Sequence, residues 1–290
     1  MSVYCFGSIN IDHFYTLPYL PAPGETLSAQ SYRTELGGKG ANQSVAAARA
    51  GADVFHLGAV GQDGAMVLSQ LAATGVNVTG VQVLPDIATG TAIVMVDAQG
   101  ENAILLHAGA NRALALEDSL RVLEAAEFGD ILLMQNETAH GPQIARAAQG
   151  RGVEVIYSAA PFDLDHAKAM LPHVNVLVVN AVEAAQLQAA MGLSLLDLPV
   201  DTVVVTRGAA GASWHARGWA EIHVDALPAQ VVDTTGAGDC FTGALAAALD
   251  RGDGPEAAMR FAAAAASVQV SRTGAAGAMP SLDEITALLG

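Results

Sequence analysis

The sequence predicts an α/β fold in which a mainly parallel sheet carries helices on both faces. Short runs rich in β-branched residues alternate with alanine-rich helical stretches along most of the 290 residues, and this alternation is typical of βαβ units. The composition agrees, because 52% hydrophobic and only 14% charged residues allow a large buried core. The length suits either two domains of ordinary size or one large α/β domain.

The predicted strands and helices follow one another in a regular order. Strand-like runs rich in valine, isoleucine and leucine cover residues 3–9, 54–60, 131–135, 153–158, 176–179 and 202–206. Alanine-rich stretches with helical character cover residues 41–50, 64–74, 140–149, 183–191, 239–250, 255–270 and 281–289. Since a helix separates most consecutive strands, we expect neighbouring strands to run parallel.

Two segments interrupt this alternation. Residues 90–97 and 101–107 flank Ala98-Gln99-Gly100 with no helix between them, which predicts a β-hairpin. Residues 13–36 contain several prolines and read as turns and short extended pieces. We expect both segments to form one accessory β-element that closes over a ligand, although two unrelated surface excursions would leave the same pattern.

Charge and composition exclude several functional classes. The formal net charge of −16 repels nucleic-acid phosphates, and the only lysines are Lys39 and Lys168. The apolar runs are too short to span a membrane. The N-terminus lacks a basic region before its first strand, and Cys5 and Cys240 form neither a disulfide framework nor a metal motif. We therefore expect a cytoplasmic protein without nucleic-acid or membrane partners.

Polar residues directly after the predicted strands are the first candidates for a site, because ligands of parallel sheets bind beyond the carboxyl ends of the strands. These residues are Asn10, Asp12, Asn136, Glu137, Asn180, Glu183, Thr206, Arg207, Gly208 and Asp233, the last of which follows the short strand-like run Gln230–Val232. Asp12 and Glu137 are suited to accept hydrogen bonds from vicinal hydroxyl groups of a neutral polyol. We expect all of them to lie at one edge of the sheet.

The strongest local motif runs from Asp233 to Asp239. Gly236-Ala237-Gly238 opens a helix, and the free N–H groups of such a start can bind a phosphate. Asp239 lies in the first helical turn and could accept a hydroxyl proton during phosphoryl transfer. The alternative role for Asp239 is an ordinary helix cap.

Three other motifs are less specific. Residues 37–43 contain a Gly-Lys pair, but Gly40 follows it, so this is not a phosphate-binding P-loop; it is either a close approach to a small polar ligand or a tight turn. Asn180 and Glu183 form a helix cap or contribute to Mg²⁺ binding through water. Residues 206–211 make a glycine turn that either holds nucleotide phosphate or reverses the chain.

Together the motifs resemble the ribokinase-like (PfkB) family of carbohydrate kinases from end to end. They comprise residues 7–12, 37–43, 89–91, 107–111, the pair Asn180 and Glu183, and residues 233–239. The resemblance implies a three-layer fold in a single catalytic domain over residues 1–290, with a small β-sheet lid from about residues 12–36 and 88–108. It implies ATP-dependent phosphorylation of a sugar hydroxymethyl group, with D-ribose to ribose 5-phosphate as the leading reaction. A nucleoside or keto-sugar acid kinase, or a sugar-binding regulator without catalysis, remains open.

The resemblance also implies roles for individual residues. The sugar would be held by Asn10, Asp12, Gly38, Lys39, Asn42 and Glu137, with Asp239 as base and Gly236, Ala237 and Gly238 as anion hole. ATP would contact Asn180, Thr206, Gly208, Gly211, Gly238 and Ala263, and Glu183 would help to position Mg²⁺ indirectly. Asp233, Thr235, Arg272 and Gly274 would bind a monovalent cation, expected to be K⁺, and the lid would form a homodimer.

Two positions depart from the family pattern. Ala263 stands where an asparagine near the adenine is frequent, which leaves the nucleotide preference open. Ala278 stands where a serine often joins the ligands of the monovalent cation, which weakens the expectation of potassium activation.

Overall fold

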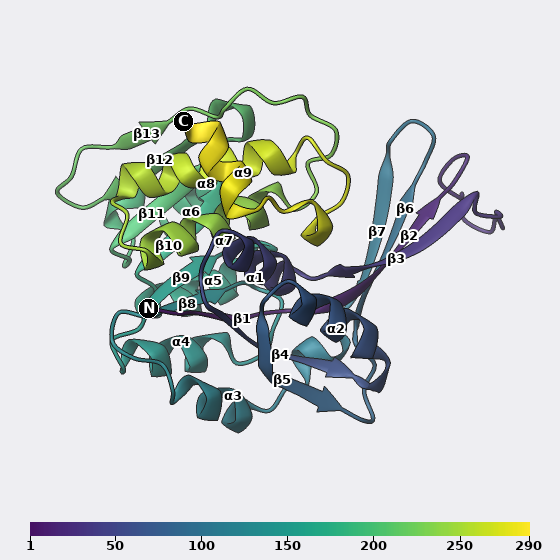
Figure 1. Cartoon of the computed structure of the whole chain (residues 1–290), viewed down its shortest axis with the longest axis horizontal. Helices are drawn as coiled ribbons and strands as arrows, with labels where there is room; N and C mark the ends of the chain where they lie inside the picture. Colours follow the sequence, from purple (N-terminus) through teal and green to yellow (C-terminus); the bar gives the residue numbers. More distant parts are fainter.

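The computed structural model describes all 290 residues and centres on a nine-stranded sheet (Figure 1). Its strands are β1 (Val3–Phe6), β4 (Val54–Gly61), β5 (Asn77–Leu84), β8 (Ile131–Met134), β9 (Glu154–Ser158), β10 (Val176–Asn180), β11 (Thr202–Thr206), β12 (Ala212–Ala216) and β13 (Ile222–Val224). Their order is β13-β12-β11-β10-β9-β8-β1-β4-β5. The strands from β11 to β5 are parallel, whereas β12 and β13 pair antiparallel at one edge.

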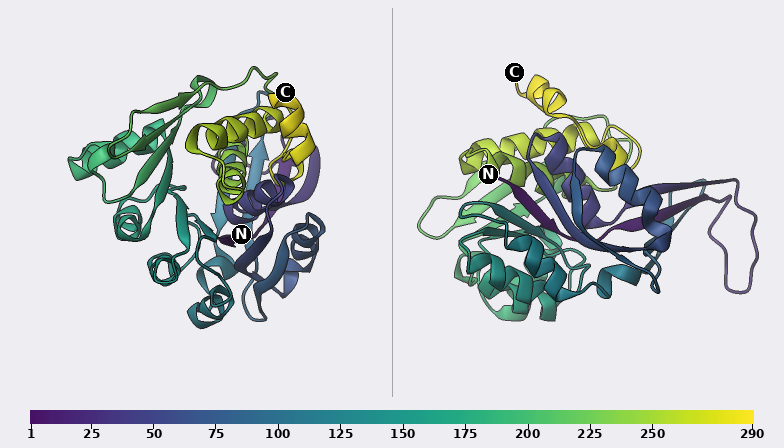
Figure 2. Two further views of the ribbon diagram at one scale, coloured as in Figure 1. Left: turned by 60° about the vertical axis from the view of Figure 1, so that its left-hand side comes forward. Right: turned by 60° about the horizontal axis from the view of Figure 1, so that its bottom comes forward.

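Helices cover both faces of this sheet (Figures 1 and 2). One layer contains α1 (Lys39–Arg49), α2 (Ala65–Ala73), α7 (Ala237–Asp250), α8 (Pro255–Gln269) and α9 (Leu282–Leu289). The other contains α3 (Leu116–Leu123), α4 (Gly141–Gln149), α5 (Leu164–Met170) and α6 (Ala181–Met191). Single 3₁₀ turns lie at Gln62–Gly64, Gly109–Arg112, Leu171–His173, Leu195–Asp197, Gly208–Ala210 and Ala276–Ala278.

Each buried strand serves two hydrophobic cores, one on each face. Val3 and Cys5 of β1 belong to a core that also contains residues of α1, α7 and α8, whereas Tyr4 and Phe6 of the same strand belong to a core that also contains residues of α4 and α5. Side chains of a strand alternate between faces, so a sheet buried on both sides needs apolar residues at every position. This requirement explains the uninterrupted apolar runs in the sequence.

A second, four-stranded sheet projects from the body of the molecule (Figure 2). Its strands are β2 (Asn10–Thr16), β3 (Ser31–Gly37), β6 (Gly90–Val96) and β7 (Asn102–His107), in the order β3-β2-β6-β7. The two segments that interrupt the strand–helix alternation therefore belong together, because β2 and β6 pair in parallel over seven residues. Asn10 and Asp12 lie at the start of β2. The small sheet therefore begins at the edge of the large sheet where the candidate site residues were expected.

The predicted fold class is confirmed, with differences in detail. Pattern reasoning missed β5, β12, β13, α3 and α5, and it reduced β2 and β3 to short extended pieces where each is a seven-residue strand. The missed helices are only seven and eight residues long, and β12 and β13 form the antiparallel edge, so their patterns are short. A membrane crossing would need a longer and more apolar helix than any found here.

Candidate active site

The carboxyl ends of the parallel strands define the candidate site. Asn10 follows β1, Glu137 follows β8, Asn180 ends β10 and Thr206 ends β11. The N-terminus of α7 meets Asn180 and Thr206 at a cavity of about 160 Å³. Residues that line this cavity are Lys39, Ser158, Ala160, Val178, Val179, Asn180, Glu183, Thr206, Thr234, Gly236, Ala237, Gly238, Asp239 and Thr242.

Asp239 is buried in the first turn of α7 and is held by two amide side chains of α1. Its Oδ2 accepts a hydrogen bond of 3.0 Å from Asn42 Nδ2, and its Oδ1 accepts one of 3.0 Å from Gln43 Nε2. Burial raises the pKa of Asp239, and repulsion from Glu137 adds to this, while Lys39 and the two amides oppose it. The result is a fixed carboxylate with increased proton affinity, which suits a general base.

Lys39 lies among carboxylates at the start of α1. Burial acts to lower its pKa, but attraction from Asp239, Glu137, Glu183 and Asp12 outweighs burial and raises the pKa. The ammonium group therefore stays charged at neutral pH and supplies a local positive charge in a chain of net charge −16. The backbone N–H of Lys39 also donates to Glu137 Oε2 at 3.1 Å.

The N-terminus of α7 presents unused backbone donors. Gly236 caps the helix in the left-handed conformation at φ 78°, where a side chain would be strained, and an added Cβ would approach Ala275 Cβ to 3.0 Å. The N–H groups of Gly238 and Asp239 donate to no acceptor in the protein. A Cβ added at Gly238 would meet no atom within 4 Å, so this backbone faces open space. Such a helix start binds anions through N–H groups and the helix dipole.

Two buried oxygen atoms of the residues predicted to hold a sugar lack hydrogen-bond donors. They are Asp12 Oδ1 and Asn42 Oδ1. Burial, with repulsion from Glu137 and Glu35 and against the attraction of Lys39, raises the pKa of Asp12 to about 7. Buried acceptors are normally paired, so these two atoms indicate a place for hydroxyl donors from a ligand.

Neighbouring residues position this polar group. Asn111 Nδ2 donates to Asn10 Oδ1 at 2.8 Å, while its own Oδ1 accepts from the N–H of Ile9 at 2.9 Å. Glu137 accepts a hydrogen bond from Ser8 Oγ. At Gly37 an added Cβ would lie 2.0–2.2 Å from the carboxyl atoms of Asp12, so the glycine makes room for that carboxyl group.

A larger, mostly apolar cavity of about 500 Å³ lies on the far side of the α7 N-terminus. Both cavities are lined by Thr206, Thr234, Ala237 and Gly238, so they adjoin each other at the start of α7. The larger one is lined by Thr206, Gly208, Ala209, Gly211, Ala226, Leu227, Pro228, Ala229, Val231, Thr234, Ala237, Gly238, Phe241, Ala263, Ala266, Ser267 and Val270. An apolar pocket that leads to an anion-binding helix start fits a nucleotide.

Asn180 and Glu183 form a complete capping box on α6. Asn180 Oδ1 accepts from the N–H groups of Val182 and Glu183, and Glu183 Oε2 accepts from the N–H of Asn180 at 2.8 Å. Glu183 also lines the smaller cavity, and its Oε1 takes part in no hydrogen bond of the protein. The capping role considered for this pair is therefore present, and one carboxylate oxygen is left for a ligand.

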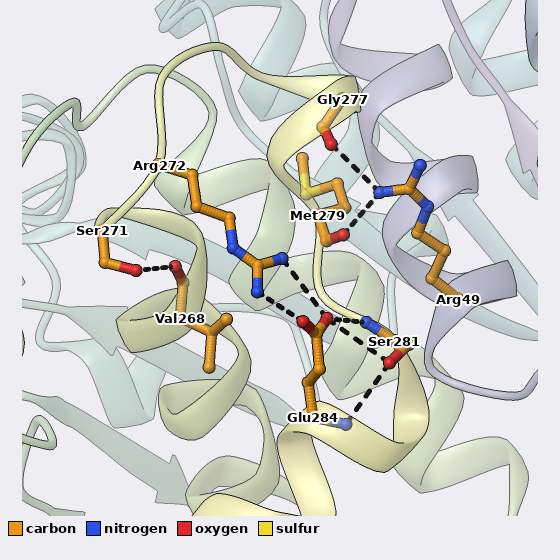
Figure 3. A network of polar contacts seen from close by, with 8 residues as sticks. All are labelled: Arg49, Val268, Ser271, Arg272, Gly277, Met279, Ser281 and Glu284. Atoms are coloured by element: carbon orange, nitrogen blue, oxygen red, sulfur yellow. Dashed lines mark hydrogen bonds and ion pairs between the residues drawn. The ribbon is translucent and has the colours of Figure 1, made fainter.

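The four residues predicted to bind a monovalent cation lie beside the α7 N-terminus. Asp233 Oδ1 accepts from the N–H of Thr235, and Asp233 Oδ2 accepts from the N–H of Gly274, both at 2.9 Å. The side chain of Arg272 turns away and pairs with Glu284 of α9 (Figure 3). No group of three or more His, Cys, Asp or Glu side chains that could hold a metal ion is present in the chain.

Sequence reasoning assigned no individual role to some residues that the structure brings to the site. Gln43 and Thr234 are the main examples, together with Gln269, which contacts Thr235 and Gly274. Gln43 follows Lys39 by four residues on α1, and this spacing places both on one helix face, so helical periodicity could have identified it. Gln269 carried no such signal, because it ends an alanine-rich helix.

Comparison with known proteins gives consistent similarities. A family model described as pfkB family carbohydrate kinase matches residues 1–282. The chain is 36% identical to a ribokinase of Haemophilus influenzae, over 96% of this chain and 95% of that protein. It is 32% identical to a deoxyribokinase of Salmonella typhi, over 100% and 99%. The structure of Arabidopsis thaliana ribokinase complexed with ribose and ATP superposes with a TM-score of 0.88 at 32% identity, covering 99% of this chain and 98% of that one.

Proposed function

Because the chain belongs to the pfkB family of carbohydrate kinases, we propose that it transfers the γ-phosphoryl group of ATP to the hydroxymethyl oxygen of D-ribose, forming ribose 5-phosphate. One observation carries the proposal. The Asp239 carboxylate is fixed by Asn42 and Gln43 next to the free N–H groups at the start of α7. The candidate base and the anion-binding backbone thus lie next to each other, where the small polar cavity and the larger apolar cavity adjoin.

Proton transfer is assigned to Asp239. Its raised pKa and its fixed orientation let it accept the proton of the hydroxymethyl group as the oxygen attacks phosphorus. Asn42 and Gln43 donate to both carboxylate oxygens and hold the group in place. Fixed placement of base and substrate supplies much of the rate enhancement in such reactions.

Two features of this chain are suited to stabilise the negative charge on the transferred phosphoryl group. The N–H groups of Gly238 and Asp239 can donate to its oxygens, and the Lys39 ammonium lies in the same cavity. Mg²⁺ in kinases is held mainly by phosphate oxygens and waters, with one or two carboxylates, rather than by a full set of protein ligands. The free carboxylate oxygen of Glu183 is suited to such a role, and the chain contains no cluster of acidic or histidine side chains that would enclose the ion. When bound, Mg²⁺ would neutralise part of the phosphate charge.

The unpaired acceptors favour ribose over 2-deoxyribose. Asp12 Oδ1 and Asn42 Oδ1 are both buried without a donor, and ribose offers vicinal hydroxyl groups for them. A site built around hydroxyl donors discriminates strongly against an analogue that lacks one of them. The similarity to a deoxyribokinase nevertheless makes 2-deoxyribose the second candidate substrate.

The same charges disfavour a keto-sugar acid. Lys39 is already surrounded by Asp239, Glu137, Glu183 and Asp12, so a substrate carboxylate would add a negative charge to an acidic site. A sugar-binding regulator without catalysis is disfavoured because the base and the anion-binding backbone are both intact.

A substrate panel tests the assignment. Initial rates of ADP release are measured with ribose, 2-deoxyribose, inosine and a keto-sugar acid at equal concentrations with Mg²⁺-ATP. We expect ribose to have the highest kcat/KM. A nucleoside that turns over far faster than ribose would end the ribose proposal, and no ADP release with any of the four would end the kinase proposal.

We further infer a homodimer formed through the small sheet. Ile104, Leu105 and Leu106 of β7 are 56%, 62% and 58% exposed, which is a concentrated apolar strand at a sheet edge. Asp12, Ala92 and Leu106 are direct partners in one row, so a subunit that covers this face would lie on the same face of the sheet as Asp12. Sedimentation of Ile104→Glu should show monomers, whereas Phe128→Glu, at a residue 87% exposed outside this sheet, should leave the dimer unchanged. Monomeric parent protein would refute the inference.

A further inference from the structure

The site expected to hold a monovalent cation already contains a hydrogen-bond donor. Gln269 Nε2 donates to the carbonyl oxygen of Thr235 at 2.6 Å and to that of Gly274 at 3.0 Å. Thr235 and Gly274 are two of the four residues to which the family resemblance assigns the cation. A cation bridging these oxygen atoms from the same side would have to occupy the space of the amide nitrogen.

The backbone N–H and C=O groups of Thr235 and Gly274 all have hydrogen-bond partners. Asp233 accepts from the N–H groups of Thr235 and Gly274, and Gln269 donates to the C=O groups of the same two residues. One acidic and one amide side chain thus bind both polar groups of each residue. The residues present therefore do not fit an additional cation between these carbonyl groups.

The orientation of the Gln269 amide is set by its surroundings. The residue is fully buried, and its Oε1 has no hydrogen-bond partner. The reversed amide would place an oxygen atom against two carbonyl oxygens, an arrangement that only a cation would stabilise. The observed orientation makes two hydrogen bonds without one. Ala278, also buried, offers no hydroxyl ligand to the site.

This pairing lies against the anion-binding backbone. Thr235 precedes Gly236, and an added Cβ at Gly236 would lie 3.0 Å from Ala275 Cβ, so the segment after Gly274 packs directly on the helix start. Farther along the same segment, Arg49 donates to the carbonyl groups of Gly277 and Met279 (Figure 3). Whatever holds Thr235 and Gly274 together therefore positions Gly236 and the N–H groups that follow it.

We propose that the side-chain amide of Gln269 replaces the monovalent cation expected at this site and holds the Thr235–Gly238 backbone in its anion-binding form without potassium. Gln269 is a positioning residue, since it lies behind the loop and contacts no substrate group. The consequence for catalysis rests on the proposed kinase function, whereas the absence of cation binding does not.

Cation dependence of the parent enzyme is the first test. ADP release is measured with Mg²⁺-ATP and ribose in choline buffer, with potassium replacing choline at constant ionic strength. We expect kcat and KM to stay unchanged. Activation by potassium of about fivefold or more, the lower end of ordinary coupling between two sites, would overturn the proposal.

A matched pair of variants is the second test. Gln269→Ala removes the amide and opens space between the carbonyl groups, whereas Gln269→Met removes the donor but keeps the volume. We expect kcat of both to fall about tenfold or more in choline, because both carbonyl oxygens lose their donor. Potassium should restore the alanine variant and leave the methionine variant low. Two variants with parental kcat in choline would overturn the proposal.

Cation binding itself is the third test and needs no activity. Melting temperatures are measured without substrate in potassium and in choline, where a bound ion stabilises the folded state. We expect potassium to raise the melting temperature of Gln269→Ala only. Thallium soaked into crystals should scatter anomalously between Thr235 and Gly274 in that variant alone. Thallium at this place in the parent would overturn the proposal even if ribose proved not to be the substrate.

Discussion

Replacing Asp12 by Asn should stabilise the protein and weaken sugar binding at the same time. The folded protein raises the pKa of Asp12 from 3.8 to about 7, chiefly through burial. Between these values the folded state binds a proton that the unfolded chain has released, so the stability contributed by this group falls as pH rises. Above about pH 7 the full cost of burying the carboxylate is present.

The magnitude follows from the shift. A change of about three pKa units corresponds to about 4 kcal/mol at a pH above both values. The uncharged amide of Asp12→Asn avoids this cost. The unfolding free energy of Asp12→Asn minus that of the parent should therefore increase by about 2–3 kcal/mol between pH 5 and pH 8. The KM for ribose should rise, because an acceptor oxygen is lost.

The assay is urea unfolding of both proteins at several pH values, followed by circular dichroism. Asp86→Asn, at an exposed position, serves as the control and should show no pH-dependent difference from the parent. A stability difference between Asp12→Asn and the parent that stays constant with pH would refute the reasoning. The same proteins assayed with ribose separate the stability effect from the binding effect.

Three further outcomes are expected from variants of the site. Asp239→Asn should lower kcat by about 10²–10⁴-fold, the usual contribution of a general base, while calorimetry still detects ribose binding; near-normal turnover would exclude its role as base. Gln43→Ala removes a donor that lowers the pKa of Asp239, so the acid limb of the kcat–pH profile should move to higher pH; an unshifted limb would contradict this. Gly37→Ala should displace the Asp12 carboxyl group and raise the KM for ribose. Gly254→Ala serves as the control and should leave the KM unchanged, because a Cβ added there meets no atom within 4 Å. Equal KM values in the two variants would contradict the role of Asp12 in sugar binding.

The strand–helix alternation was sufficient to predict the α/β class, since it depends on local periodicity. The glycine-opened start of α7 was also recognisable, because the donors that bind an anion are backbone groups whose availability follows from their place in the helix. The pairing of β2 with β6 was expected only in outline. Strand register depends on contacts between segments some eighty residues apart, which neither segment encodes alone.

The sequence by itself determined the family, the fold class and the identity of the candidate base, because each depends on a short motif or a local pattern. Only the tertiary structure decided what surrounds that base. Asp239 meets Gln43 from 196 positions away, and Gln269 reaches Thr235 from 34 positions away. Such hydrogen bonds depend on how α1, α7 and α8 pack together, so the pKa of Asp12 and the replacement proposed for the cation follow from packing rather than from any motif.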